Sequence, residues 1–233
     1  MNGKSDDILA RVDRYYQDYS ARARQLSNEG KKVIGYICSF VPLEIITAAG
    51  FVPFRIRGDV NEPITEGDTN LETISCPFFR SCFDLSVKGK YDFLAGTVSA
   101  HGCDSMTRTY SVWKYTLGLP YSHFINVPHT LSESSMEFFV AELNTFRKSL
   151  GRFAGKEISN DELDEAIRLY NENRAKARAL YELMKTDPPL ISGTELTKIL
   201  TVGTGLPVSE SNELFDAVLE QFRQRKEPPH KKA

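Results

Sequence analysis

The chain has 233 residues, enough for one well-cored domain or for a domain with a helical appendage. Apolar residues make up 41% and charged residues 26%, which is typical of a soluble globular chain and excludes a disordered or fibrous protein. The formal net charge of −2 gives no global attraction to nucleic acid or to an anionic membrane.

The first half of the sequence alternates between helical and strand patterns. A helix is predicted from Asp6 to about Gln25, where apolar and aromatic residues follow helical spacing. Four short apolar runs then predict buried strands, at residues 31–38, 51–57, 91–100 and 121–128. Pro53 favours an edge position for the second of them. Helices are predicted between these strands, at residues 42–49, 77–88 and 105–117, and a loop at residues 58–69.

The second half of the sequence is helical throughout. Helices are predicted at residues 132–151, from the capping box that starts at Ser159 to about Asp187, and at residues 194–200 and 209–225. The predicted fold class is α/β, a small parallel sheet with flanking helices plus a C-terminal helical segment. The predicted domains are an N-terminal helix (1–30), an α/β lobe (31–130) and the helical segment (131–233).

The four cysteines require an explanation other than disulfide bonding. No run of 18 apolar residues predicts a transmembrane helix, and the polar N-terminal segment lacks the apolar core of a signal peptide. These features predict a cytoplasmic protein, in which structural disulfides are rare. Core packing, metal binding and redox chemistry are the roles left open.

Three of the cysteines fall where a parallel α/β domain forms its sites. Cys38 and Cys103 each follow a predicted strand and precede a helix, and Cys76 opens another helix. Sites in such domains lie beyond the carboxyl ends of the strands, so three separate loops could converge on one rim. Helix N-termini favour anions, and thiolates are ligands for iron–sulfur clusters, zinc or copper(I). Cys82 lies inside the predicted helix and so points elsewhere.

The alternative is that the cysteines are small buried apolar residues. No CxxC pair is present, and compact ferredoxin motifs and zinc ribbons both need such close pairs. Spacing alone therefore leaves packing and metal binding equally open.

Longer stretches around these cysteines resemble a known family. The segment GKKVIGYICSFVPLEIITAAGFVPFRI, and then CPFFRSCFDLSVKGKYDFLAGTVSAHGCDSMTRTYSVW, are similar to the opening and middle of the 2-hydroxyacyl-CoA dehydratase and benzoyl-CoA reductase family. Asn126-Val-Pro-His129 resembles the benzoyl-CoA reductase side of that family. The helical section that ends in Pro-Pro and Ser-Gly is also similar, so the likeness covers about Gly30 to Leu214.

The resemblance implies a cofactor and its ligands. Proteins of the family bind a [4Fe–4S] cluster through three cysteines, which match Cys38, Cys76 and Cys103, and one iron keeps a site that no cysteine occupies. Cys82 is left as an extra ligand or a packed thiol. The resemblance also implies an acyl-CoA substrate, a paralogous subunit or second lobe as partner, and an ATP-dependent activator protein. That activator supplies single low-potential electrons, with which the thioester is reduced to a ketyl-type radical.

Several polar residues near the cysteines are candidates for chemistry, each with a structural alternative. Ser39 could donate a hydrogen bond to a cluster sulfur or to the substrate, or cap a helix. Glu44 could act as an acid or base, or be favoured in a first helical turn by the dipole. His101 could exchange protons or be an ordinary loop residue, and Arg80 could pair with a CoA phosphate or form a structural salt bridge. Asp104 is interpreted as an N-cap.

The sequence leaves two main functions to distinguish. Family members usually continue into a second α/β lobe, and this sequence stops at Ala233, where that lobe would begin. The first hypothesis is an iron–sulfur subunit, or half-subunit, of an acyl-CoA dehydratase or benzoyl-CoA reductase. The alternative is a non-catalytic electron-transfer or assembly module that holds the cluster. A zinc-stabilised or cysteine-packed interaction domain is a weaker third possibility.

Overall fold

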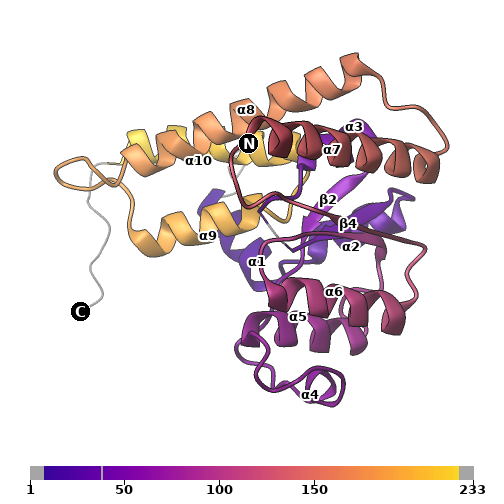
Figure 1. Ribbon diagram of the computed structural model, residues 1–233. Coiled ribbons are helices and arrows are strands. Elements are labelled where there is room, and N and C mark those ends of the chain that lie inside the picture. The colour runs from indigo at the N-terminus through magenta and orange to yellow at the C-terminus, as the bar shows by residue number, and fades with distance from the viewer. Residues whose placement is uncertain (1–7, 38, 226–233) are drawn as a thin grey trace. The chain divides into compact units, whose positions relative to one another are not determined.

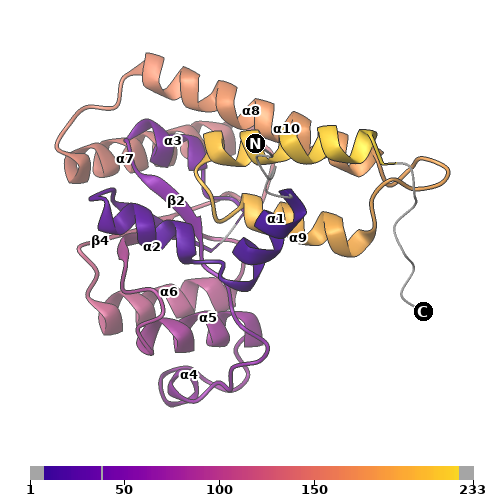
Figure 2. The ribbon, with the colours of Figure 1, turned by 180° about the vertical axis from the view of Figure 1, so that it is seen from behind.

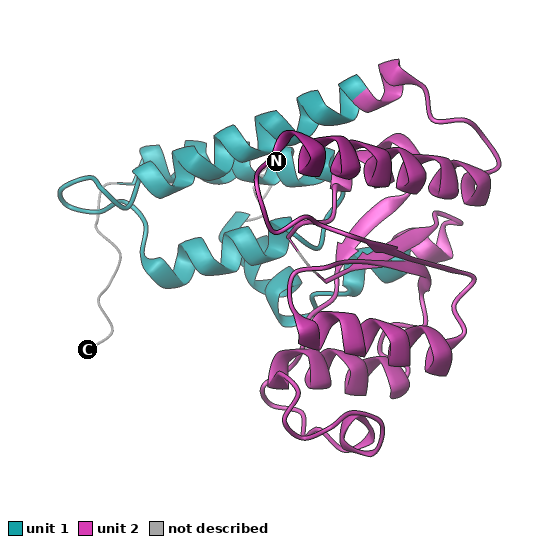
Figure 3. Cartoon of the chain, viewed as in Figure 1, with its two compact units in different colours: residues 1–25, 164–233 teal, residues 26–163 magenta. Residues whose placement is uncertain are grey.

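The computed structural model describes residues 8–37 and 39–225, which fall into two compact units (Figure 3). One unit comprises residues 26–163 and contains the sheet; the other comprises residues 1–25 and 164–233 and is helical where described. Helices α2 (Ala21–Asn28) and α8 (Asn160–Glu182) contain the two boundaries. No helix within the described ranges is long and apolar enough to cross a membrane.

The sheet unit confirms the predicted α/β class. Its strands are parallel and lie in the order β2-β1-β3-β4. Their bounds are Val33–Tyr36 (β1), Val52–Arg55 (β2), Leu94–Ala100 (β3) and Tyr121–Ile125 (β4). Pro53 lies in β2, an edge strand, as its missing N–H predicts.

Helices cover both faces of this sheet. Helices α3 (Leu43–Ala48) and α7 (Glu133–Ala154) lie over one face, and α5 (Pro77–Val87) and α6 (Asp104–Leu117) lie over the other (Figures 1 and 2). The chain leaves β1 in one direction through α3 to β2, and then returns through α5 to β3 on the far side of β1. This reversal makes the carboxyl ends of β1 and β3 a topological switch point, where open α/β sheets bind their ligands.

The core of the sheet unit consists of apolar side chains from the strands and from the covering helices. Those buried to 0% exposure include Ile34, Phe54, Phe83, Val98, Ile125 and Phe146. Burying a side chain of this size contributes about 1.5–3 kcal/mol to the free energy of unfolding. The packing of the helices on the sheet is therefore stabilised by this core.

A short helix, α4 (Glu66–Asn70), occupies the region predicted to be a loop. Its local sequence, EGDTN, has acidic residues in the first turn, but the N-cap residue Thr65 makes no side-chain capping hydrogen bond. The backbone N–H groups of Thr65 and Gly67 donate to the buried carboxylate of Asp84 in α5, at 2.7 and 3.0 Å. A distant side chain thus takes the place of a local N-cap, which explains why the sequence did not predict this helix.

The helical unit contains α1 (Ile8–Gln17), α9 (Gly193–Gly203) and α10 (Val208–Arg223), with most of α8. The single helix predicted up to Gln25 is wrong, because a turn at residues 18–20 separates α1 from α2. In that turn Asp18 accepts hydrogen bonds from the backbone of Ala21 and the side chain of Arg24. The unit has its own core, from Val12 of α1 to Leu180, Ile199, Leu214 and Val218.

Candidate functional site

A cavity of about 240 Å³ opens at the carboxyl ends of the strands, at the switch point. Residues from three connections line it: Ile37 and Ser39 after β1, Arg55 at the end of β2, and Gly102 and Cys103 after β3. Phe40, the first turn of α5 and Met106 of α6 complete the described lining. The predicted convergence of loops on this rim is therefore present for the loops after β1 and β3.

Cys103 is the N-cap residue of α6 and is exposed at this cavity. Its backbone is extended, with φ of −169°, and its carbonyl accepts the amides of Met106 and Thr107. Its side chain makes no capping hydrogen bond, so helix capping does not occupy the thiol. The expectation that Asp104 is the N-cap is wrong by one residue, since Asp104 is the first residue of the helix.

Cys76 holds the corresponding position on α5, as its N-cap residue, and is partly buried. Its side chain also makes no capping hydrogen bond, and Pro77 fixes the first helical position after it. Phe78 and Phe79, the next residues, line the cavity. Two of the three predicted ligands thus begin adjacent helices at the same edge of the sheet, where free N–H groups favour an anion.

The third predicted ligand, Cys38, lies outside the described residues. Both of its neighbours, Ile37 and Ser39, line the cavity. Among the residues that the structure describes, which exclude Cys38, no three His, Cys, Asp or Glu side chains are grouped to hold a metal ion.

Cys82 differs from the rim cysteines because it is fully buried in α5. Burial raises the pKa of its thiol to about 12, although the positive charge of Arg55 acts in the opposite direction. A neutral, buried thiol is a packing group, and of the two roles left open for Cys82 the structure favours packing over ligation.

Arg55 brings a positive charge to the cavity, and no sequence motif singled it out. Its guanidinium lies 5.9 Å from the ring centroid of Tyr36. Burial raises the pKa of that phenol to about 12, against the lowering effect of Arg55. Its position in the sequence could have identified it, because Arg55 is the last residue of β2 and therefore lies at the edge of the sheet where ligands bind.

The two candidates for catalysis separate in the structure. Ser39 is exposed and lines the cavity, and it is no helix cap, because Pro42 is the N-cap residue of α3. Glu44 lies in the first turn of α3, and the described lining of the cavity does not include it. Of these two residues, Ser39 is the one among the described residues that line the cavity.

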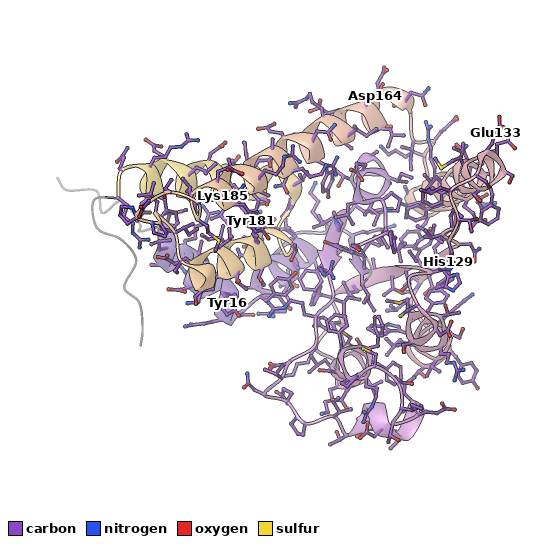
Figure 4. All side chains as sticks on the ribbon, turned by 60° about the vertical axis from the view of Figure 1, so that its left-hand side comes forward. Tyr16, His129, Glu133, Asp164, Tyr181 and Lys185 are labelled. Atoms are coloured by element: carbon purple, nitrogen blue, oxygen red, sulfur yellow. The ribbon has the colours of Figure 1, made fainter. Side chains whose placement is uncertain are left out.

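The remaining polar candidates have structural partners. Arg80 pairs with Asp68 and donates to the carbonyl of Thr73, so it forms the structural salt bridge that was the alternative to CoA binding. His101 lies edge-on to His129, with ring centroids 4.8 Å apart. His129, labelled in Figure 4, precedes α7, so this pair joins the ends of β3 and β4.

Comparison with known proteins identifies relatives over most of the chain. The family model for the 2-hydroxyglutaryl-CoA dehydratase D-component matches residues 38–233. A benzoyl-CoA reductase subunit of Thauera aromatica is 30% identical over 214 residues, which are 90% of this chain and 55% of that protein. The beta subunit of lactoyl-CoA dehydratase from Anaerotignum propionicum is 28% identical over 185 residues, 79% of this chain and 47% of that protein.

A third relative, the beta subunit of (R)-2-hydroxyglutaryl-CoA dehydratase from Acidaminococcus fermentans, is 24% identical over 174 residues, 74% of this chain and 46% of that protein. The chain spans about half the length of the curated relatives it matches. Because the family model covers most of the sequence, the chain belongs to the 2-hydroxyglutaryl-CoA dehydratase D-component family.

Proposed function

We propose that this chain is the iron–sulfur part of a subunit of an acyl-CoA dehydratase or benzoyl-CoA reductase. The observation that carries the proposal is the cavity at the switch point, which Cys103 lines and beside which Cys76 begins α5. The relatives are named as subunits of enzymes that act on acyl-CoA compounds, which supports the same class of substrate here.

The proposed cofactor is a [4Fe–4S] cluster held by Cys38, Cys76 and Cys103; Cys103 lines the cavity, and Cys76 begins α5, whose first turn lines it. Thiolates are the usual ligands of such clusters, and neither described rim thiol is used in helix capping. The cluster with its thiolates is anionic, so the N-termini of α5 and α6 and the guanidinium of Arg55 would stabilise it. When bound, the cluster would supply low-potential single-electron chemistry and an open iron position.

The protein's own residues would position the substrate and exclude water. The Ser39 hydroxyl can donate a hydrogen bond into the cavity, to a sulfur or to a thioester oxygen. Phe78 and Phe79 form an apolar wall, with ring centroids 5.4 Å apart, which lowers the local dielectric. We further propose a paralogous subunit or second lobe as partner, and an ATP-dependent activator as the source of electrons.

Anaerobic purification with iron and sulfide analysis tests the proposal. We expect about four iron and four sulfide per chain, and their loss in each of Cys38→Ser, Cys76→Ser and Cys103→Ser. The matched control is Cys82→Ala, which removes a buried thiol without adding an unpaired hydroxyl and should keep the iron. Iron-free protein after anaerobic reconstitution would refute the assignment.

Acyl-CoA titration separates the enzyme subunit from a module that only transfers electrons. Saturable binding of an acyl-CoA thioester to the iron-loaded protein, weakened by Ser39→Ala, is expected for the subunit. Loaded protein that binds no acyl-CoA, alone or with its partner subunit, would instead identify an electron-transfer or assembly module.

A further inference from the structure

A second, larger cavity lies at the opposite edge of the sheet. Its volume is about 830 Å³, and it is formed by the C-terminal half of α7 and by residues 155–160. Helix α7 begins after the carboxyl end of β4 and runs back along the sheet, so its last turns reach the amino edge (Figure 1). None of the described cysteines lines this groove, and the proposed function does not use it.

The groove has fixed walls. Gly155, at a φ of 73°, reverses the chain after α7, and its amide and that of Lys156 donate to the carbonyls of Arg152 and Gly151. The Arg147 Nε donates to the carbonyl of Ile158 at 2.9 Å and holds the returning segment against the helix. A Cβ at Gly151 would meet the carbonyl oxygen of Lys156 at 2.8 Å, so glycine permits this close approach.

The lining is strongly cationic. It contains the four basic residues Arg147, Lys148, Arg152 and Lys156 but one carboxylate, that of Glu157. Two of the cations have structural roles, since Arg147 holds the wall and Lys156 pairs with Glu162.

The other two cations, Lys148 and Arg152, face the groove without a counter-ion. Both are exposed, and neither forms an ion pair within the described part of the chain. They lie one turn apart on α7, where side chains are about 5–6 Å apart at Cβ. The helix dipole accounts for a cation in the last turn, such as Arg152, but not for Lys148, which lies a turn earlier.

We propose that this groove binds a small ligand through a diphosphate group. Its volume lies in the range of small-molecule sites, roughly 300–1,000 Å³. A guanidinium forms paired hydrogen bonds with phosphate, and an ammonium adds a compact positive charge. Adjacent phosphate groups would therefore lie between Arg152 and Lys148. The diphosphate could belong to a free nucleotide or to coenzyme A.

Calorimetric titration of the full chain with inorganic diphosphate, ADP and coenzyme A tests this proposal. The double variant Lys148→Gln/Arg152→Gln should weaken binding of the preferred ligand about tenfold or more, since a tenfold change corresponds to about 1.4 kcal/mol. Arg152→Lys should have a smaller effect because it keeps the charge. Lys185→Gln, an exposed lysine paired with Glu182, is the matched control and should bind as the unmodified chain does.

The ligands separate the two sources of diphosphate. Binding of ADP without coenzyme A supports a free nucleotide, and tighter binding of coenzyme A supports a coenzyme A nucleotide held apart from the cluster cavity. No saturable binding of any of the three, or equal affinity in the double variant, would overturn the proposal. Iron content is independent of these substitutions, so failure here is distinguishable from failure of the cluster assignment.

Discussion

The buried carboxylate of Asp84 should contribute several kcal/mol to the free energy of unfolding of the sheet unit. Asp84 is 1% exposed and accepts hydrogen bonds from Thr65 N, Gly67 N and Lys88 Nζ, at 2.7, 3.0 and 2.6 Å. Burial would raise the pKa of this carboxyl, but the bonds from Lys88 and the two amides outweigh it and hold the pKa below its ordinary value. These bonds attach the α4 segment to the helix that Cys76 begins.

Replacement of Asp84 by alanine removes the hydrogen-bond acceptor and leaves the amides of Thr65 and Gly67 without it. Hydrogen bonds to charged groups contribute about 1.5–3 kcal/mol each, and breaking a buried pair costs about 3–5 kcal/mol. Lys88 is 25% exposed and can be rehydrated, so the two amides carry most of the loss. We therefore expect Asp84→Ala to lower the free energy of unfolding by about 3–5 kcal/mol.

Urea unfolding followed by tryptophan fluorescence measures this loss. Trp113, the single tryptophan, is buried in α6 against Phe83 and so reports on the sheet unit. The control is Glu72→Gln, which removes an exposed ion pair with Arg108 in the same unit and should cost about 0.2–1 kcal/mol. A loss below about 1 kcal/mol for Asp84→Ala would refute the reasoning.

The pH dependence of the same measurement has a definite sign. The folded-state pKa of Asp84 is lowered, so its contribution is present above the unfolded-state value of about 4. As the pH falls through the folded-state pKa, the carboxylate is protonated and the contribution is lost. The difference between the unmodified chain and Asp84→Ala should therefore shrink below about pH 4.

Two further predictions concern the cavity. In metal-free protein at pH 8, iodoacetamide should modify the exposed Cys103 quickly and Cys82 only after unfolding. The reason is that burial raises the pKa of the Cys82 thiol to about 12. Equal labelling rates of the two cysteines, measured by mass spectrometry, would contradict this prediction. In the iron-loaded protein, Arg55→Gln should make the midpoint potential more negative by on the order of tens of millivolts, because a nearby positive charge is removed. Arg55→Lys should restore much of the difference in a redox titration, and an unchanged potential in Arg55→Gln would exclude the electrostatic role.

The sequence predicted the strands and their helices well because each strand is an apolar run bounded by helix signals. It also placed Cys103 at the carboxyl end of a strand, since that follows from chain order alone. The order of the strands in the sheet does not follow from chain order, because it depends on which side of β1 the chain places β2 and β3. The switch point between β1 and β3 therefore became visible only in the structure.

Several features that the sequence did not predict depend on distant partners. Helix α4 is capped by Asp84 from another helix, and Arg55 reaches the cavity because β2 pairs with β1. Ser39 looked like a helix cap by local pattern, but the N-cap of α3 lies three residues later at Pro42, and Ser39 lines the cavity instead. Local sequence patterns do not predict such tertiary contacts.

The positions of the cysteines predict which variants affect ligand binding and which affect the stability of the fold. Cys76 and Cys103 lie at helix ends outside the apolar core, so serine at either position removes a thiolate and leaves the packing of the sheet intact. Cys82 lies within the core at 0% exposure, where a change in volume or polarity affects stability. Iron content and unfolding free energy should therefore respond to different cysteines. Parallel losses of both quantities in every variant would mean instead that the rim cysteines belong to the core.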